Sequence, residues 1–536
     1  MERRVNTFEG TPTSLNRKEN EKMKRITLFF IGFLLLSMQP LVHAEVTLPS
    51  VIGSNMVLQR DMQVPIWGWA SPGEEITITL STEGENAEPL FSTTVVASDA
   101  EGNWRTELPA RQAGGPYSLH ITGSNTLELT NVLFGEVWVC SGQSNMEWSV
   151  RASKDSDAEI AAADYPTIRL FDIPHRPSGL LQQDVEANWH ETTPQTIENF
   201  SAVAYYFGRK LYKNLNVPIG LISTNWGGTR IEPWTPPVGF TSVPALESIS
   251  KEIQEADASY REQLPKKMKE IEAWIAETRK ALETDTRLTQ MPDNRHPLRH
   301  QARPTGLYNG MVHPIVPYAI RGAIWYQGES NLQDGMLYHE KMKALINGWR
   351  AVWGQGDFPF YFVQLAPFNY GWGASPFLLP TIWEAQATTL SVPHTGMAIT
   401  TDVGNLKDIH PQNKQEVGRR LALWALAKTY GREDVTYSGP IYKSMVVEGN
   451  TIRLSFDFIG SGLMARDEKP LTWFEIAGEN KQFVEAEATF DGDTIVVSSG
   501  AVENPVAVRF GWHQSAEPNL INKEGLPASP FRTHPW

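Results

Sequence analysis

VWVCSGQSNMEW, residues 137–148, is the stretch on which the prediction of the fold depends. It opens with an apolar, strand-like run, and the chain then turns at Gly142. Ser144 follows, flanked by the amide side chains of Gln143 and Asn145. A buried strand that ends in a glycine turn and presents a hydroxyl is how a nucleophilic serine is held at the edge of an α/β sheet. The spacing is Gly-x-Ser-x-Met rather than Gly-x-Ser-x-Gly. This stretch alone is therefore weak evidence for a catalytic serine, and other motifs in the chain must support it.

The composition narrows the class of protein. The chain has 536 residues, of which 41% are hydrophobic and 20% charged, as in a globular protein of about three domains. A net charge of −14 without basic blocks argues against binding to nucleic acid or to anionic membranes. The 18 tryptophans favour a carbohydrate ligand, because indole faces stack on the apolar faces of sugars, although most tryptophans belong to cores. The single cysteine, Cys140, excludes an intramolecular disulfide and is expected to be a buried apolar residue.

The N-terminal residues are typical of an export signal. Lys24-Arg25 precedes an apolar run, 26–36, and Val42-His43-Ala44 fits a small-x-small cleavage site. We therefore predict that residues 1–44 are a leader and signal peptide that ends near Ala44, and that the protein is exported to the periplasm or the outside of the cell. The run is too short to cross a bilayer, and we expect no membrane span in the mature chain.

The rest of the chain divides into three regions by its pattern. Residues 45–130 and 431–536 show short alternating strands between turns, which predicts a β-sandwich-like domain at each end. Residues 131–430 alternate strands with helices, which predicts an α/β domain with a three-layer parallel sheet. Its expected strands are 134–140, 168–173, 219–224, 320–326, 360–365 and 396–401, and its expected helices are 202–213, 338–353 and 415–428.

Residues 245–300 interrupt this alternation. Apolar residues recur at helical spacing before Pro265 and again after it, which predicts a helical hairpin inserted into the α/β domain. A solvated structural insertion is the expected role, with a cap over the site or a partner surface as alternatives.

A catalytic serine needs a base and an acid that orients the base. His410 is the preferred base, because Pro411 holds it in an extended conformation in which Asp408, two residues earlier, faces the same side. His313, which follows a turn rather than a strand, is the alternative base.

Two further stretches place polar groups after expected strands. Residues 327–331 read Gln-Gly-Glu-Ser-Asn, and an amide side chain there can donate to an oxyanion. Residues 226–229 read Trp-Gly-Gly-Thr, and glycines let backbone N–H groups approach a ligand closely. Ligands of parallel sheets bind at this carboxyl edge.

Together these stretches resemble the sialate O-acetylesterase family of the SGNH hydrolase superfamily. The resemblance rests on Gly142 to Met146, Trp226 to Thr229, Gln327 to Asn331 and Asp408 to Pro411, with further matches at 307–311 and 522–530. It runs from about residue 48 to the C-terminus. It implies a flavodoxin-like sheet domain and an esterase that removes O-acetyl groups from sugars.

The resemblance also implies roles for individual residues. The expected catalytic residues are Ser144, His410 and Asp408, and the expected oxyanion donors are Ser144, Gly227, Gly228, Gln327 and Asn331. Weaker candidates for substrate binding are Gln143, Asn145, Trp226, Arg230, Glu329 and Asn309. No spacing typical of metal ligands is present, and neither a metal nor another cofactor is expected.

Two departures from the superfamily leave alternatives open. The residue three before His410 is Lys407 instead of an aspartate, so Asp402 stays the second choice for the acid. Ser330 stands where an asparagine is usual, so the amide donor is Gln327, which we prefer, or Asn331.

Acetylated sialic acid is the first expected substrate, and acetylated xylan or another polysaccharide is the alternative. A carbohydrate-binding protein that has kept an esterase scaffold without activity is the alternative of another class. The presence of serine, histidine, acid and glycines argues for the enzyme. Neither the acetyl position that is cleaved nor the oligomeric state follows from the sequence.

Overall fold

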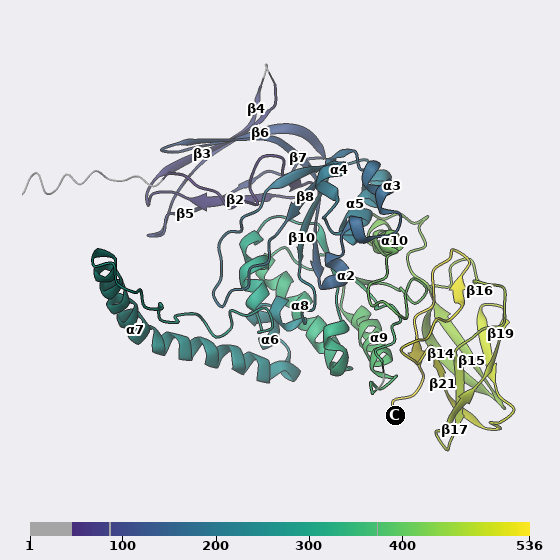
Figure 1. Cartoon of the computed structure of the whole chain (residues 1–536). Coiled ribbons are helices and arrows are strands. Elements are labelled where there is room, and N and C mark those ends of the chain that lie inside the picture. Colours follow the sequence, from purple (N-terminus) through teal and green to yellow (C-terminus); the bar gives the residue numbers. More distant parts are fainter. Residues whose placement is uncertain (1–44, 85–86, 372) are drawn as a thin grey trace, which may run out of the picture. The chain divides into compact units, whose positions relative to one another are not determined.

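Strand β7 (Thr126–Gly142) links the two regions that the sequence divides at residue 130. In the computed structural model, which describes residues 45–84, 87–371 and 373–536, its first half pairs antiparallel with β6 (Gly114–Thr122). Its second half pairs in parallel with β10 (Ile219–Asn225) and β11 (Gly322–Tyr326) (Figure 1). The predicted boundary therefore falls inside one continuous strand. The predicted signal peptide lies outside the described residues.

The central sheet has the order β13-β12-β11-β7-β10-β8-β9. Neighbouring strands of this sheet pair in parallel, except that β9 is antiparallel to β8. The sheet is therefore mixed and not the parallel sheet that the sequence predicts. Its remaining strands are β8 (Tyr165–Asp172), β9 (Trp189–Thr192), β12 (Phe360–Val363) and β13 (Thr395–Ala398). The six strands expected from the sequence all occur here, and the α/β class is confirmed.

The helices of this region are α2 (Ser144–Glu147), α3 (Ser156–Ala161), α4 (Pro194–Ile197), α5 (Ala202–Leu215), α6 (Pro237–Thr241), α7 (Glu247–Glu283), α8 (Leu337–Trp353), α9 (Leu378–Thr388) and α10 (Lys414–Trp424). The predicted helices correspond to α5, α8 and α10. Helices α5 and α10 pack closely at Gly418, where a Cβ atom would come within 2.7 Å of the Cβ of Tyr206. This contact fixes α10 and the loop in front of it, which carries His410.

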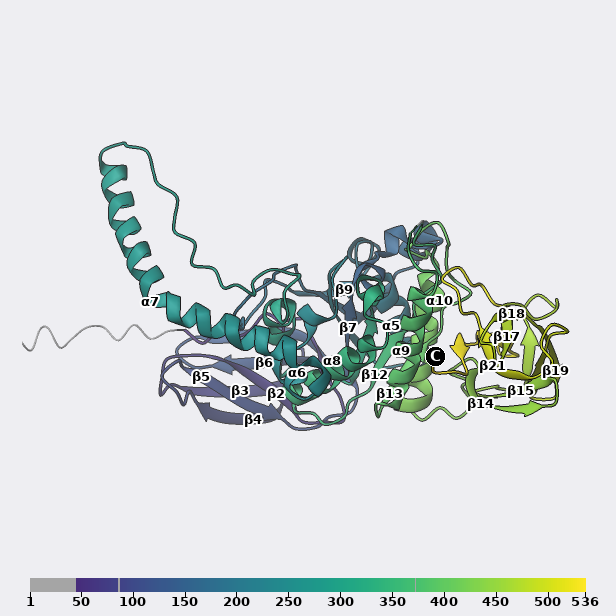
Figure 2. The same ribbon diagram turned by 90° about the horizontal axis from the view of Figure 1, so that it is seen from below.

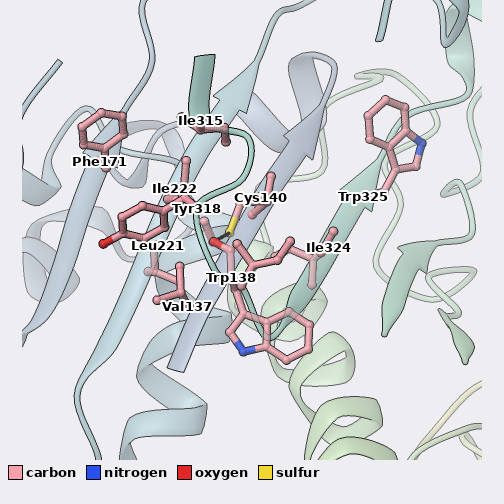
Figure 3. Packing of buried hydrophobic residues seen from close by; sticks show 14 of the residues in the cluster. Val137, Trp138, Cys140, Phe171, Leu221, Ile222, Ile315, Tyr318, Ile324 and Trp325 are labelled. Atoms are coloured by element: carbon pink, nitrogen blue, oxygen red, sulfur yellow. Dashed lines mark hydrogen bonds between the residues drawn. The ribbon is translucent and has the colours of Figure 1, made fainter. Parts of the chain in front are cut away.

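The core of the sheet is strongly apolar. Figure 3 shows side chains of β7, β10 and β11 packed together, among them Trp138, Cys140 and Ile324. Cys140 is fully buried, and burial raises the pKa of its thiol far above the usual range. A thiol that stays protonated is a poor nucleophile, so Cys140 serves packing.

Two further β-regions accompany the central sheet. The N-terminal one contains β1 (Val57–Gln59), β2 (Val64–Trp69), β3 (Glu75–Thr82), β4 (Pro89–Val96) and β5 (Asn103–Leu108). The C-terminal one contains β14 (Ile441–Glu448), β15 (Thr451–Asp457), β16 (Leu463–Ala465), β17 (Phe474–Gly478), β18 (Phe483–Glu485), β19 (Glu487–Asp491), β20 (Thr494–Ser498), β21 (Pro505–Phe510), β22 (Leu520–Asn522) and β23 (Phe531–Arg532). Eight of the C-terminal strands form two four-stranded sheets, β14-β15-β20-β19 and β18-β17-β21-β23, and β16 pairs with β22 in a third, two-stranded sheet. Buried residues of these sheets share one core.

The predicted helical hairpin is wrong. α7 is one helix of 37 residues with Pro265 inside it, and the chain returns without a second helix (Figure 2). Proline removes one hydrogen bond and displaces the carbonyl group four residues earlier. Both Pro265 and Arg261, whose carbonyl is freed, are exposed, so water can satisfy that carbonyl and the helix continues. No helix in the described parts of the chain is long and apolar enough to cross a membrane.

Candidate active site

Ser144 is the first residue of α2, directly after β7. Gly142 has a φ of +148°, and a Cβ atom there would lie 2.1 Å from the carbonyl oxygen of Tyr326. The glycine therefore lets β7 end against β11, and the Gln143 N–H donates to the Tyr326 carbonyl at 3.0 Å. The turn leaves Ser144 half-buried at the carboxyl edge of the sheet, as the sequence predicts.

His410 is far from Ser144 in the sequence, but its imidazole contacts this serine in the structure. Its Nε2 lies 3.0 Å from Ser144 Oγ, which is hydrogen-bond distance. Its ring stacks on the indole of Trp148, with 4.5 Å between centroids and 15° between planes. Stacking on one face and the hydrogen bond at Nε2 together fix the orientation of the imidazole.

Of the two candidate acids, Asp408 lies beside the base. Its Oδ1 is 3.5 Å from His410 Nδ1 and accepts the backbone N–H of His410 at 2.9 Å. Asp402 accepts two N–H groups of Arg420, at 2.6 and 2.7 Å, and is thereby engaged elsewhere. The alternative base, His313, contacts the carbonyl of Gln182 through Nδ1 at 2.8 Å.

The electrostatics around His410 favour the neutral imidazole. Burial lowers the pKa of His410, the charge of Lys414 lowers it further, and Asp408 opposes both. A neutral imidazole at Nε2 can accept the hydroxyl proton of Ser144, which is what a general base must do.

Lys414 is a residue that the sequence analysis missed. It is completely buried, and burial lowers its pKa to about 7 against the attraction of Glu329 and Asp408. Its Nζ donates to the side-chain oxygen of Asn145. A lysine at the start of an amphipathic helix is expected at the surface; only its place four residues after His410 could have indicated a role.

Asn145 and Glu329 belong to the same buried network. The amide of Asn145 donates to Glu329 Oε1 at 2.6 Å and to the Ile409 carbonyl at 3.0 Å, and so ties the serine turn to the histidine loop. Both side chains form hydrogen bonds inside the protein, and their role in substrate binding stays a prediction.

The third stretch does not offer the amide donor that the sequence predicts. The Gln327 amide nitrogen donates to Asn331 Oδ1 at 2.7 Å and to the Thr229 carbonyl at 3.2 Å. The Asn331 amide donates to Glu232 and Asp334 at 3.0 and 2.6 Å. Each amide has two N–H groups, and both are taken, so neither side chain is left to stabilise an oxyanion.

Two other residues predicted to bind substrate also have partners inside the protein. The guanidinium group of Arg230 donates to Glu232, to Asp334 and to the Ser330 carbonyl, and 38% of this side chain is exposed. Asn309 is buried and donates to the Ser178 carbonyl at 3.2 Å, away from Ser144.

Gln143 is better placed to meet a ligand. Its Oε1 accepts long hydrogen bonds, of 3.4 Å each, from the backbone N–H groups of Gly328 and Ser330. This orients the amide nitrogen away from them. Within the described residues that nitrogen has no acceptor, and Gln143 immediately precedes the serine.

The glycine stretch lies against the serine. A Cβ atom at Gly227 would be 3.3 Å from the Cβ of Ser144, so this position has no room for a side chain. The Gly227 N–H donates to the carboxylate of Glu147, whose other oxygen is 3.1 Å from His175 Nε2. The Gly228 N–H has no acceptor among the described residues, and Gly228 is exposed with a φ of +71°.

His175 is a second residue near the serine that was not predicted from the sequence. Its ring stacks on Trp226 at 4.2 Å and 4°. With Glu147 and Asp172 it lines a cavity of about 280 Å³. Burial raises the pKa of Asp172, although a hydrogen bond from Ser223 and the charge of His175 act against this. Both Asp172 and His175 lie at the end of β8, and this position after a predicted strand could have identified them.

No group of three or more His, Cys, Asp or Glu side chains in the described residues could hold a metal ion. The site thus contains a hydroxyl, an imidazole, a carboxylate and unpaired N–H donors, which together are suited to acyl transfer.

Comparison with known proteins agrees with this chemistry. The model of the family described as "carbohydrate esterase, sialic acid-specific acetylesterase" matches residues 134–286 and 296–427. Mouse sialate O-acetylesterase is 30% identical over 505 residues, which cover 86% of this chain and 88% of the mouse protein. The human sialate O-acetylesterase is 30% identical over 429 residues, 73% of this chain and 72% of that protein.

A solved structure is also similar. The crystal structure of a carbohydrate acetylesterase from Xanthomonas citri has a TM-score of 0.75 and 36% identity, and covers 92% of this chain and all of that one. The chain therefore belongs to the sialic acid-specific acetylesterase family of carbohydrate esterases and is a carboxylic ester hydrolase.

Proposed function

We propose that this enzyme removes O-acetyl groups from sugars through an acetyl-serine intermediate. The distance of 3.0 Å between Ser144 Oγ and His410 Nε2 is the observation that carries the proposal. Asp408, at the other ring nitrogen, holds the tautomer in which Nε2 is free to accept a proton.

The reaction proceeds in two halves. His410 takes the Ser144 proton as the hydroxyl oxygen attacks the acetyl carbonyl, and returns it to the sugar oxygen when the ester bond breaks. A water molecule then attacks the acetyl-enzyme with His410 again as base, and acetate leaves with Ser144 restored.

The oxyanion of each tetrahedral intermediate needs donors that are fixed in advance. We assign this role to the backbone N–H groups of Ser144 and Gly228 and to the side-chain amide of Gln143. The Gln143 amide takes the place of those of Gln327 and Asn331, because the N–H groups of these two side chains already donate to other protein groups. Gly227 supports the site by its lack of a side chain, since its N–H is bound to Glu147.

Acetylated sialic acid is the first candidate substrate, because the relatives are named for it. A neutral acetylated glycan such as xylan is the second candidate substrate. The acidic residues near Ser144 favour a neutral sugar over an anionic one. Glu147 and Asp172 line the adjacent cavity, where the carboxylate of a sialic acid would meet like charge. The cations nearest in the network, Arg230 and Lys414, are already bound by protein groups.

Export remains part of the proposal. We infer that residues 1–44 direct the chain out of the cytoplasm and that the mature enzyme begins near residue 45, where it would meet glycans in the periplasm or outside the cell. N-terminal sequencing of the secreted protein tests this; a mature chain that still begins at Met1 would contradict it.

Ser144→Ala tests the activity directly. Acetate release from p-nitrophenyl acetate, acetylated sialic acids and acetylated xylo-oligosaccharides is expected to fall by at least about 10³-fold, because the nucleophile is gone. The matched control is Ser149→Ala, a half-buried serine of the same segment, which is expected to keep wild-type rates. Undiminished release by Ser144→Ala would end the proposal, and the preferred substrate of the wild type decides between the two candidates.

A further inference from the structure

A second cavity is lined mainly by residues of the C-terminal β-region, and Ser144 does not line it. Its volume is about 530 Å³, within the range of roughly 300–1,000 Å³ that is typical of small-molecule sites. Its wall combines aromatic rings with two carboxylates and an imidazole, contributed by Phe377, Trp473, Trp512, His513, Glu475 and Glu485.

Trp473 is the unusual residue of this cavity. Its indole is 40% exposed, so it is not there to fill a core. Its φ of +64° lies in the left-handed region, which is unfavourable for a bulky side chain and which glycine adopts freely. Neither burial nor backbone conformation therefore explains a tryptophan at this position, and residues held in such conformations gather at ligand sites.

The groups around Trp473 can bind hydroxyls. Its ring stacks on that of His513, with 5.9 Å between centroids and 25° between planes. His513 Nδ1 accepts the Ser515 N–H at 3.1 Å, so the neutral ring carries its proton on Nε2 and can donate it. Glu475 and Glu485 stand directly opposite each other on β17 and β18 and offer acceptors.

Charged groups of both signs surround the cavity. The Arg509 guanidinium lies over the Phe377 ring at 5.5 Å. That of Arg532 lies over Trp512 at 5.2 Å and pairs with Glu384 at 2.9 Å. Two of the aromatic faces thus already carry guanidinium groups, and the two carboxylates of the wall would repel an anion, so we take an uncharged ligand as the occupant.

We propose that this cavity is a second carbohydrate-binding site, in which a neutral pyranose stacks on Trp473 and its hydroxyls bind Glu475, Glu485 and His513. A sugar ring has one apolar face and a rim of hydroxyls, which matches an indole platform edged by acceptors and one donor. This site goes beyond the proposed esterase function and does not depend on it.

The cavity is also tied to the catalytic loop. Gln514, next to His513, donates its N–H to the Pro376 carbonyl and accepts the Phe368 N–H, and the Asn369 N–H donates to the Leu406 carbonyl at 3.3 Å. The loop that contains Leu406 also carries Asp408 and His410. A glycan held on Trp473 is therefore retained at the edge of the catalytic region, which would raise the local concentration of a polymeric substrate.

The test measures binding of unacetylated neutral hexasaccharides (xylo-, cello- and manno-hexaose) by isothermal titration calorimetry. Wild type is expected to bind at least one of them, and Trp473→Gly to bind it at least tenfold more weakly. The glycine relieves the backbone, so its melting temperature is expected to equal or exceed that of wild type. Trp473→Tyr is expected to restore part of the affinity.

Controls separate this site from the esterase. Trp536→Ala, which removes an equally exposed indole (39%) outside the cavity, is expected to bind like wild type. All variants are expected to hydrolyse p-nitrophenyl acetate at the wild-type rate, whereas Trp473→Gly is expected to raise KM for an acetylated polymer. If the wild-type enzyme shows no esterase activity, the proposed function fails, but the binding measurement still tests the second carbohydrate site.

Three results would overturn the inference: no hexasaccharide binds to wild type, Trp473→Gly binds as tightly as wild type, or choline or free sialic acid occupies the cavity in preference to every neutral sugar.

Discussion

At the scale of single residues, the pKa of His410 sets the pH range in which the enzyme can work. The imidazole must be neutral to take the serine proton, so kcat/KM rises with pH through this pKa. Burial and Lys414 hold it below the ordinary value of about 6.5, and the acidic limb of the profile is expected below that pH.

Two substitutions are predicted to move this limb in opposite directions. Lys414→Met removes a cation, so the pKa of His410 rises and the limb shifts to higher pH. Asp408→Asn removes an anion, so the limb shifts to lower pH, and the plateau also falls because the tautomer is no longer held. The measurement is kcat/KM for p-nitrophenyl acetate between about pH 4 and 9.

Lys343→Met is the control, since Lys343 pairs with Glu340 on α8 and does not contact the site. Its profile is expected to match that of wild type. A limb that stays in place in Lys414→Met, or moves down, would show that the buried lysine does not act on His410.

At the scale of elements, the loop after β10 contains two adjacent glycines. Substitution of Gly227 is expected to lower activity, whereas substitution of Gly228 is expected to lower stability. A side chain at Gly227 would press on Ser144 Cβ, at 3.3 Å, and on the Glu147 carboxylate, at 2.9 Å. Gly227→Ala is therefore predicted to lower kcat/KM roughly 10- to 100-fold by displacing the nucleophile, with little change in melting temperature.

Gly228→Ala is the matched control. A Cβ atom there meets nothing within 4 Å, but the φ of +71° is unfavourable for alanine. The expected result is a loss of about 1–2 kcal/mol of stability with nearly unchanged activity, because the backbone N–H is kept. If Gly227→Ala is fully active, the loop does not press on the serine as described.

The elements themselves were largely predictable from the sequence. Strands of the central sheet are short apolar runs that end at turn residues, and α5, α8 and α10 have apolar residues at helical spacing. The continuity of β7 through residue 130 was not predictable, because alternation does not say with which neighbours a strand pairs. The unbroken α7 was missed because exposure of Pro265 decides whether a proline ends a helix.

Only those residues of the candidate site whose location depends on the local backbone conformation were predictable from the sequence. Ser144, His410 and Asp408 follow from strand ends, a glycine and a proline, all of which act locally. The hydrogen-bond partners of Gln327 were not predictable, because the partner of an amide depends on side chains such as Asn331 that tertiary packing supplies. Lys414 was missed for the same reason.

At the scale of the whole molecule, the part of α7 beyond Pro265 is expected to be dispensable for the chemistry. None of residues 266–294 is buried, and the family match is interrupted at residues 287–295. The base of this insertion is held separately, since His296 Nε2 lies 3.1 Å from Asp257 Oδ1 and its ring is 4.6 Å from that of Tyr260.

Replacing residues 266–294 by a short Gly-Ser linker is therefore predicted to leave kcat/KM for p-nitrophenyl acetate within about twofold of wild type, because none of the replaced residues belongs to the buried core. The same variant assayed on acetylated oligosaccharides separates the roles of the insertion. A loss confined to the large substrates would identify it as a cap over bound glycan, whereas a loss on p-nitrophenyl acetate would contradict the prediction.

In the proposed reaction Ser144 is the residue that carries the acetyl group. The direct measurement is peptide mass spectrometry of the wild-type enzyme mixed with p-nitrophenyl acetate and quenched in acid during the first turnover. One acetyl group is predicted on the peptide that contains Ser144, at that serine, and none in Ser144→Ala. An acetyl group that accumulates on another side chain while Ser144 stays unmodified would show that Ser144 is not the nucleophile.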